Sequence, residues 1–297
     1  MSSTAERLVR FSTDAFGLER ILRLVQAIIQ IVVAVPLLSL RLTDHINSLP
    51  HQAAGAGPGP GTGGDKGPAP LAVADTVAML GDLRGRLNTT RRVLRLFRFA
   101  EAFHGAQKLY FSSTTTTGKS LELWLDISAR GFNGMYYLLE TATLPDALGV
   151  PHLPRVFGPE TGGALAVEAQ RFWLLALACS AASGALKVLG TYGAEAVPGT
   201  GAAAAAGLGG DVVGEKEGEE EEERGKRREE EKAKVRAAQQ ANAAKRRVCL
   251  RKMVADLADI ALPGSALGWV PLDPLSVSSA MLLTSILTSL DFWERCA

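Results

Sequence analysis

LRGRLNTTRRVLRLFRFAEAFHGAQKLYF, residues 83 to 111, carries the helical pattern that decides the fold class. At about 100° per residue, it predicts one uninterrupted helix with arginines on a narrow stripe and large apolar residues over most of the opposite side. The stripe consists of Arg84, Arg91, Arg95 and Arg98. The apolar side consists of Leu87, Val93, Leu94, Leu96, Phe97, Ala100 and Phe103. Such a helix suits the headgroup region of an anionic membrane. Periodicity alone equally allows a bundle helix with its arginines in water.

The composition predicts a folded, all-helical chain. With 297 residues and 47% hydrophobic content, the sequence can bury one large core or two modest ones. The formal net charge of +1 hides an asymmetry, because residues 215 to 231 are dominated by glutamate while the arginine stretch is basic. Sustained alternation of apolar and polar residues and Asn-Gly hairpin turns are missing, so strands are not expected. The expected fold class is all-α, a membrane-associated helical bundle with two disordered low-complexity linkers.

Two low-complexity linkers divide the sequence into three helical regions. Residues 50 to 70 are rich in Gly and Pro. Residues 193 to 234 pass from a Gly/Ala stretch into a Glu-rich one. Both are predicted to be disordered, although the later half of the second could form a lone polar helix with the residues that follow it. The helical regions are an N-terminal apolar region (1–49), the arginine helix with a helical bundle (71–192), and a basic helix with a C-terminal membrane segment (235–297).

Three apolar stretches differ in how well they suit a membrane span. Residues 19 to 42 contain arginine, glutamine and Pro36, which favours a buried or interfacial helix with a kink over a span. Residues 172 to 186 lack charge but are short for a span. Residues 275 to 293 are the best span candidate, with a core helix as the alternative. Either both later stretches span, which puts the arginine helix and the Glu-rich linker on opposite sides, or a single C-terminal span keeps everything before it cytosolic.

Two further patterns predict helix packing. Small residues recur every four positions at Ala176, Ser180 and Gly184, which permits close contact with another helix. Residues 121 to 148 have helical spacing and several aromatic side chains, for which core packing is the first interpretation and membrane-interface anchoring the second. These aromatic residues are Trp124, Phe132, Tyr136 and Tyr137.

Catalytic and cofactor-binding patterns are missing. The stretch TTTTGKS ends at Ser120 like a phosphate-binding loop, but Ser113 stands where the first glycine belongs and no strand is predicted before it. The four histidines are isolated, and the three cysteines lie far apart without metal-ligand spacing. The N-terminus lacks the pattern of a secretory signal. We therefore expect no enzyme activity, no cofactor and no metal, and thiols that face a reducing compartment.

The order of the helical patterns resembles the peroxisomal biogenesis factor 11 family. The resemblance rests on LRGRLNTTRRVLRLFRFAEAFHGAQ, WLDISARGFNGMYYLLETATL and KMVADLADIALP, followed by a C-terminal apolar segment. It covers most of the chain outside the two linkers. The Gly/Pro insertion and the Glu-rich stretch depart from the family pattern and look like fungal-type elaborations.

The resemblance implies a peroxisomal membrane protein that drives elongation, proliferation and fission of the organelle. The implied partners are a peroxisomal import receptor and fission machinery such as a dynamin-related GTPase. We also expect an anionic phospholipid membrane as a partner, a homo-oligomer, and no nucleic acid, because a phosphate-binding helix rarely needs six large apolar residues opposite its arginines.

The predicted membrane-binding residues follow from the amphipathic pattern. The arginine stripe would attract anionic lipid, and Leu94, Phe97 and Phe103 would insert as a wedge that expands the cytosolic leaflet. The arginines of this site are Arg84, Arg91, Arg95 and Arg98. The alternative function is a peroxisomal membrane pore or metabolite channel, which would need polar residues lining several spans.

Overall fold

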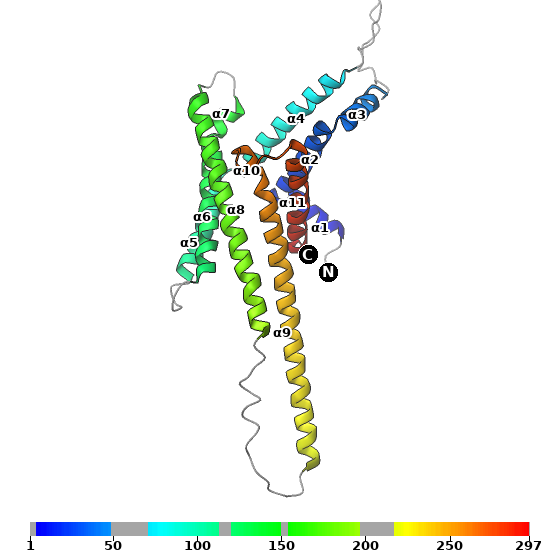
Figure 1. The fold of residues 1–297 in the computed structure, drawn as a ribbon, viewed down its shortest axis with the longest axis vertical. Coiled ribbons are helices and arrows are strands. Elements are labelled where there is room, and N and C mark those ends of the chain that lie inside the picture. The colour runs from blue at the N-terminus through cyan, green and yellow to red at the C-terminus, as the bar shows by residue number, and fades with distance from the viewer. Residues whose placement is uncertain (1–3, 49–70, 113–119, 150–153, 197–216, 297) are drawn as a thin grey trace, which may run out of the picture.

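The described residues of the computed structural model form helices only (Figure 1). They comprise residues 4–48, 71–112, 120–149, 154–196 and 217–296, without the side chains of residues 193–196, 217–228, 231 and 238. The all-α prediction is therefore confirmed for these ranges. The first predicted linker, residues 50 to 70, lies outside them, as do residues 197–216 of the second.

The N-terminal region contains three helices with sharp breaks between them. Helix α1 spans Thr4–Thr13, α2 spans Ala15–Ala34 and α3 spans Pro36–Ser48. The side chain of Asp14 accepts a hydrogen bond from the backbone N–H of Phe16 at 2.8 Å and so caps α2. Val35 is extended, as expected for a residue before proline, and α2 and α3 meet at a bend of 102°. The predicted kink near Pro36 is confirmed.

The arginine stretch is two helices, so the prediction of one uninterrupted helix is wrong. Helix α4 spans Val73–Leu94 and α5 spans Arg98–Ser112. Between them, Phe97 has a φ of +66°, a left-handed conformation that residues other than glycine seldom adopt. The break lets α4 pack against α2 while α5 packs against α6. The apolar residues predicted to share one face therefore belong to two helices that pack against different partners. Local periodicity contains no information about these distant partners.

Helix α6 packs against both α5 and α8 (Figure 1). Helix α6 spans Leu121–Ala142, the short α7 spans Leu144–Leu148, and α8 spans Gly158–Ala196. The ring of Phe103 lies against Gly134, where a Cβ atom would be 2.7 Å from Cε1 of the ring. Tyr136 is buried and stacks on Trp173 with ring centroids 5.4 Å apart. Core packing is thus confirmed for Tyr136, whereas Trp124 is 46% exposed.

The C-terminal region begins with a long helix that continues past the bundle (Figure 1). Helix α9 spans Glu217–Asp259, α10 spans Ala261–Ala266 and α11 spans Pro274–Arg295. Residues 217 to 234 belong to α9 and residues 193–196 end α8, so the prediction of disorder is wrong for both, and the alternative of a helix over the later half of the linker and the residues after it is confirmed. The physical reason is composition, because Glu, Lys, Arg and Ala are all good helix formers, and opposite charges four residues apart support a helix.

Helix α8 confirms one prediction and corrects another. Ser180 donates a hydrogen bond to Oδ2 of Asp256 on α9 at 2.6 Å, and a Cβ at Gly184 would lie 3.5 Å from Cβ of Met253. The small residues therefore do permit close helix contact, as predicted. Residues 172 to 186, however, are part of a helix of 39 residues. The prediction that this stretch is short for a span is therefore wrong, because the helix continues beyond it on both sides.

The turn between α1 and α2 gives a stability prediction. A Cβ at Gly17 would lie 1.8 Å from the carbonyl oxygen of Phe11, so Gly17→Ala must displace backbone. The displacement would also disturb the contact of the Phe11 ring with Phe292 on α11, at a centroid distance of 5.6 Å. We expect the free energy of unfolding to fall by about 1–3 kcal/mol, measured as a lower melting temperature of the purified chain in detergent.

The matched control is Gly81→Ala in α4, where nothing lies within 4 Å of the added Cβ. There, alanine should leave the melting temperature unchanged or raise it, because it is the better helix former. Equal melting temperatures for the two variants would contradict the Gly17 packing.

Candidate functional site

Within the described ranges, two helices are long and apolar enough to cross a membrane by length and composition. They are Gly158–Tyr192 within α8 and Pro274–Arg295, the whole of α11. Only 28% of the most apolar window of the first and 22% of that of the second are buried inside the structure. The outer faces of both helices are therefore apolar and uncovered. The bent pair α2 and α3 passes the same test only when both helices are taken together.

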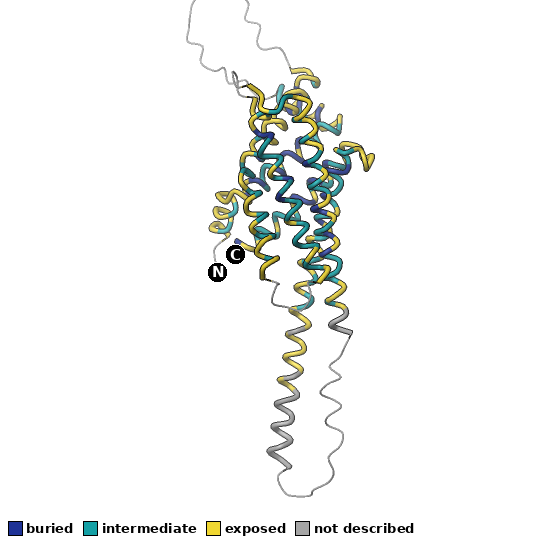
Figure 2. Tube along the Cα trace, turned by 90° about the vertical axis from the view of Figure 1, so that its left-hand side faces the viewer, coloured by how far each residue is buried: buried dark blue, intermediate teal, exposed yellow. Residues whose placement is uncertain are grey.

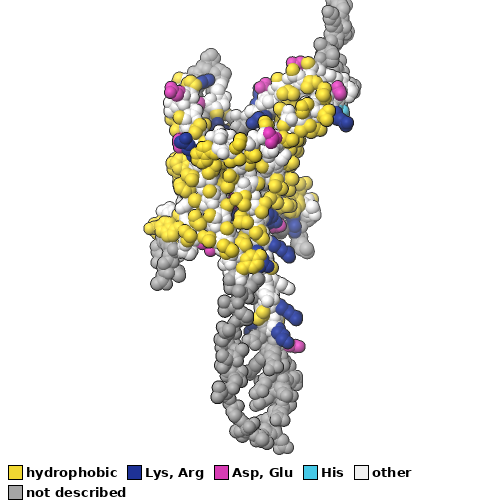
Figure 3. All heavy atoms as spheres, in the orientation of Figure 1, with side chains coloured by type: hydrophobic (Ala, Val, Ile, Leu, Met, Phe, Trp, Pro, Cys, Tyr) yellow, Lys and Arg dark blue, Asp and Glu magenta, His cyan; other side chains and the backbone are white. Residues whose placement is uncertain are grey.

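The interior is as polar as it is apolar. Among the described residues, twelve hydrophobic and thirteen polar or charged residues are buried. Figure 2 shows the buried residues in the middle of the bundle, and Figure 3 shows hydrophobic side chains over much of its outer face. A soluble protein buries apolar residues preferentially, so this distribution favours a bundle whose outside contacts lipid.

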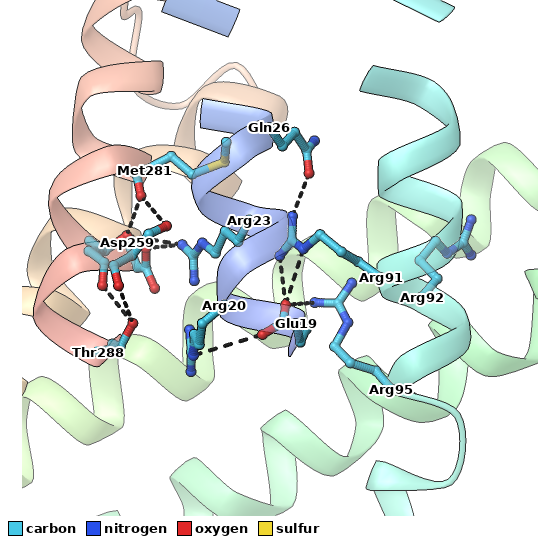
Figure 4. A network of polar contacts seen from close by, with 12 residues as sticks. Glu19, Arg20, Arg23, Gln26, Arg91, Arg92, Arg95, Asp259, Met281 and Thr288 are labelled. Atoms are coloured by element: carbon cyan, nitrogen blue, oxygen red, sulfur yellow. Dashed lines mark hydrogen bonds and ion pairs between the residues drawn. The ribbon is translucent and has the colours of Figure 1, made fainter. Parts of the chain in front are cut away.

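Glu19 on α2 is the centre of a buried charge network (Figure 4). Its Oε1 atom accepts hydrogen bonds from Nε and Nη2 of Arg91 on α4, at 3.1 Å and 2.8 Å. Nη1 of Arg95 lies 4.0 Å from the same oxygen. Nη1 of Arg91 also donates to the side-chain oxygen of Gln26 at 2.6 Å. Burial lowers the pKa of the Arg91 guanidinium from its ordinary value, although the attraction of Glu19 opposes this shift.

The same arginines connect α4 to α6. Nη2 of Arg95 donates to Oε1 of Glu140 at 2.8 Å. Nη2 of Arg92 donates to the backbone oxygen of Glu140 at 3.0 Å and to Oγ1 of Thr143 at 2.6 Å. Arg95 therefore lies between two carboxylates, Glu19 of α2 and Glu140 of α6. Carboxylates of α2 and α6 thus fix the C-terminal end of α4 on two sides.

Arg23 connects α2 to the C-terminal helices. Its guanidinium forms a buried ion pair with Asp259 at the end of α9. Nη2 also donates to Oγ1 of Thr284 on α11 at 3.1 Å. Four helices of different sequence regions thus meet through polar contacts that start from α2.

A cavity of about 1300 Å³ lies among these charged side chains. It extends from exposed residues of α4, Arg84 and Asn88, to the buried Arg23. Of the described residues that line it, ten are Lys or Arg and five are Asp or Glu. The lining comes from α2, α4, α5, α6, α8, α9, α10 and α11. Among the residues that the structure describes, no group of three His, Cys, Asp or Glu side chains has the geometry to hold a metal ion.

On the cavity wall, Asp126 of α6 forms a smaller polar cluster with α8. It accepts hydrogen bonds from Nζ of Lys187 and from Oγ of Ser183, both at 2.6 Å. Burial alone would raise the pKa of Asp126, but these hydrogen bonds outweigh it and hold the pKa below its ordinary value. The carboxylate is therefore charged at neutral pH and neutralises Lys187.

The structure separates the predicted membrane-binding arginines. Arg84 is exposed, whereas Arg91 is only 7% exposed and Arg95 is held between two carboxylates. The guanidinium of Arg98 lies over the ring of Phe16, 4.1 Å from its centroid. The alternative of a bundle helix with its arginines in water is wrong for Arg91, which is only 7% exposed. This arginine is a buried bundle residue.

The predicted wedge residues are separated as well. Phe97 is 66% exposed at the break between α4 and α5, whereas Leu94 is half-buried and Phe103 packs on Gly134. Sequence reasoning missed the carboxylates that hold the arginines, above all Glu19 and Glu140. One signal was present, since charged side chains inside an apolar stretch such as 19 to 42 usually have a specific partner.

The network predicts a large cost for removing its central carboxylate. Glu19→Gln leaves the buried Arg91 without its charge partner, so we expect a loss of about 3–5 kcal/mol in the free energy of unfolding. Thermal unfolding of the purified chain in detergent measures this loss. Glu168→Gln is the control, because the Glu168–Arg171 pair is about half exposed and should contribute at most about 1 kcal/mol. A Glu19→Gln protein as stable as the control would show that the network does not hold α4 to α2.

Comparison with known proteins identifies the family. The model of the family "Peroxisomal biogenesis factor 11 (PEX11)" matches residues 71–293, from the start of α4 almost to the end of α11. No curated protein and no solved structure matches the chain. The family is one of biogenesis factors and is not a known family of enzymes. Since the match covers most of the sequence, the chain belongs to the peroxisomal biogenesis factor 11 family and is a peroxisomal membrane protein of peroxisome biogenesis.

Proposed function

We propose that this protein promotes elongation, proliferation and fission of peroxisomes by inserting the amphipathic segment around the α4–α5 break into the cytosolic leaflet. One observation carries the proposal, namely that Phe97 projects from the break with 66% of its surface exposed. Val93, one turn earlier on α4, is 44% exposed. Arg84 and Arg86 of the same helix are exposed and can reach lipid headgroups.

The mechanism follows from the area that such a segment occupies. Apolar side chains inserted at the headgroup level expand one leaflet only, and the bilayer relieves the asymmetry by curving. Each arginine near an anionic surface contributes about 1 kcal/mol to binding. In the present arrangement Arg91 and Arg95 position the break through Glu19 and Glu140, so lipid contact begins with Phe97, Val93 and the outer arginines. Release of α4 from α2 would add Arg91 and Leu94 to the inserted surface.

Removal of the exposed ring tests this mechanism. Phe97→Ala deletes apolar surface worth about 2 kcal/mol of burial in lipid, while the buried network remains intact. The full chain is reconstituted into liposomes of neutral and anionic phospholipids, and tubules are counted by electron microscopy. We expect several-fold fewer tubules for Phe97→Ala.

Phe111→Ala serves as the matched control, because Phe111 is 59% exposed but lies at the far end of α5. It should tubulate liposomes as the unmodified chain does. The mechanism would be refuted if Phe97→Ala tubulates equally well, or if both variants lose the same fraction of activity.

A second candidate function is a pore or metabolite channel in the same membrane. The observation that favours it is the charged cavity between several helices, because a pore needs polar residues that line several membrane segments. We propose that the cavity forms part of a conducting path, either in one chain or in an oligomer.

A volume substitution tests conduction separately from tubulation. Ala166 and Ala164 are both exposed on α8, but only Ala166 lines the cavity. Ala166→Trp should therefore lower the conductance of planar bilayers that contain the chain, whereas Ala164→Trp should not. Equal conductance in both variants, or none in the unmodified chain, would exclude the pore.

A further inference from the structure

We propose that the charged cavity described above is a binding site for a phosphate-bearing anion. The proposal concerns occupancy of the cavity, so it depends neither on insertion of Phe97 into lipid nor on conduction. It rests on three properties of the cavity lining, which are its charge, its buried donors and its access.

The charge of the inner cavity is unbalanced. Of the ten Lys or Arg and five Asp or Glu side chains of the whole lining, the part around α2 and the end of α4 holds six arginines and three carboxylates, Glu19, Glu140 and Asp259. The arginines are Arg20, Arg23, Arg91, Arg92, Arg95 and Arg98. Arg23, Arg91 and Arg95 are each ion-paired with one of the three carboxylates at short range. An excess of buried positive charge is unfavourable unless an anion neutralises it.

Several arginine donors in the lining have no acceptor. The Nε atoms of Arg23, Arg92 and Arg95 are buried and have no hydrogen-bond partner among the described residues. The side chains of Arg23 and Arg95 are only 6% and 10% exposed, so little bulk water reaches them. Buried donors are normally satisfied, and a guanidinium has a planar set of donors that fits phosphate oxygens in pairs.

The cavity is also accessible and large enough. Its wall continues from the buried arginines to the exposed Arg84 and Asn88 on the outer part of α4. A volume of about 1300 Å³ exceeds that of an inorganic ion and accommodates an organic phosphate. Two sources provide this chemistry, the headgroup of an anionic phospholipid and a soluble phosphate compound. Both would present the same phosphate to the same arginines.

Arg20 allows the site to be tested without breaking the buried network. Its Nε lies 3.8 Å from Oε2 of Glu19, and Glu19 keeps Arg91 when Arg20 is neutralised. Arg20→Gln therefore removes one cavity charge but leaves no carboxylate unpaired. Arg86→Gln makes the same change on an exposed part of α4 that does not line the cavity. Arg98→Gln is a second cavity variant, because Arg98 has no ion pair among the described residues that Gln would break.

The experiment uses the full chain in a nonionic detergent and two probes, inorganic phosphate and dihexanoyl phosphatidate below its micelle concentration. Titration calorimetry measures the dissociation constants, and melting temperatures report folding and stabilisation by the ligand. We expect binding to the unmodified chain, affinity that is weaker by about tenfold in Arg20→Gln and Arg98→Gln, and unchanged affinity in Arg86→Gln. Binding of both probes indicates a site open to soluble phosphate compounds, and binding of phosphatidate alone indicates a lipid headgroup site.

Two results would overturn the proposal. One is the absence of binding heat and of any melting shift with both probes. The other is an equal loss of affinity in Arg20→Gln, Arg98→Gln and Arg86→Gln, because it would show general attraction of anions to a basic surface. If Arg20→Gln fails to fold, as its melting curve would reveal, the comparison of Arg98→Gln with Arg86→Gln decides the question.

Discussion

The ion pairs that Glu19 makes with Arg91 and Arg95 are the constraint on which the rest of the structure depends. A charge removed from water costs several kcal/mol unless an opposite charge and hydrogen bonds compensate it. The carboxylate of Glu19 on α2 therefore requires the end of α4 beside it, and Arg95 must reach Glu140 of α6 as well. Since α4 is held at this point, the chain turns at Phe97 before α5 can pack along α6.

The bundle is held together by the contacts that are effective in lipid. Apolar surface gains little by leaving a hydrocarbon environment, so helices in a membrane associate through polar contacts and through small residues that allow close approach. Both occur here, as the Arg23–Asp259 pair between α2 and α9 and the approach of Gly184 on α8 to α9. The apolar side chains of α8 and α11 remain on the outside, where a peroxisomal membrane protein needs them.

Two of the four arginines of the amphipathic stripe, Arg91 and Arg95, are held inside the bundle. A guanidinium that is buried against a carboxylate cannot lie at a lipid headgroup at the same time. In this structure Arg91 and Arg95 connect helices of the bundle and line its cavity, so the proposed contact with lipid falls to exposed residues such as Phe97 and Arg84. One basic stripe thus supplies both an internal charged site and an outer amphipathic surface, which links the two proposed properties of the protein.

The sequence by itself determined the properties that depend on local chemistry. Helical periodicity and missing strand signals indicated the all-α class, Pro36 located a break, composition indicated α11 as a span candidate, and the order of patterns pointed to the family. Only the tertiary structure decided where the arginines lie, because Arg91 finds its partner Glu19 72 positions away in the sequence. The turn at Phe97 and the burial of Phe103 on Gly134 depend on similarly distant contacts. Periodicity within one helix describes which residues share a face, but the partner that covers this face belongs to another part of the chain.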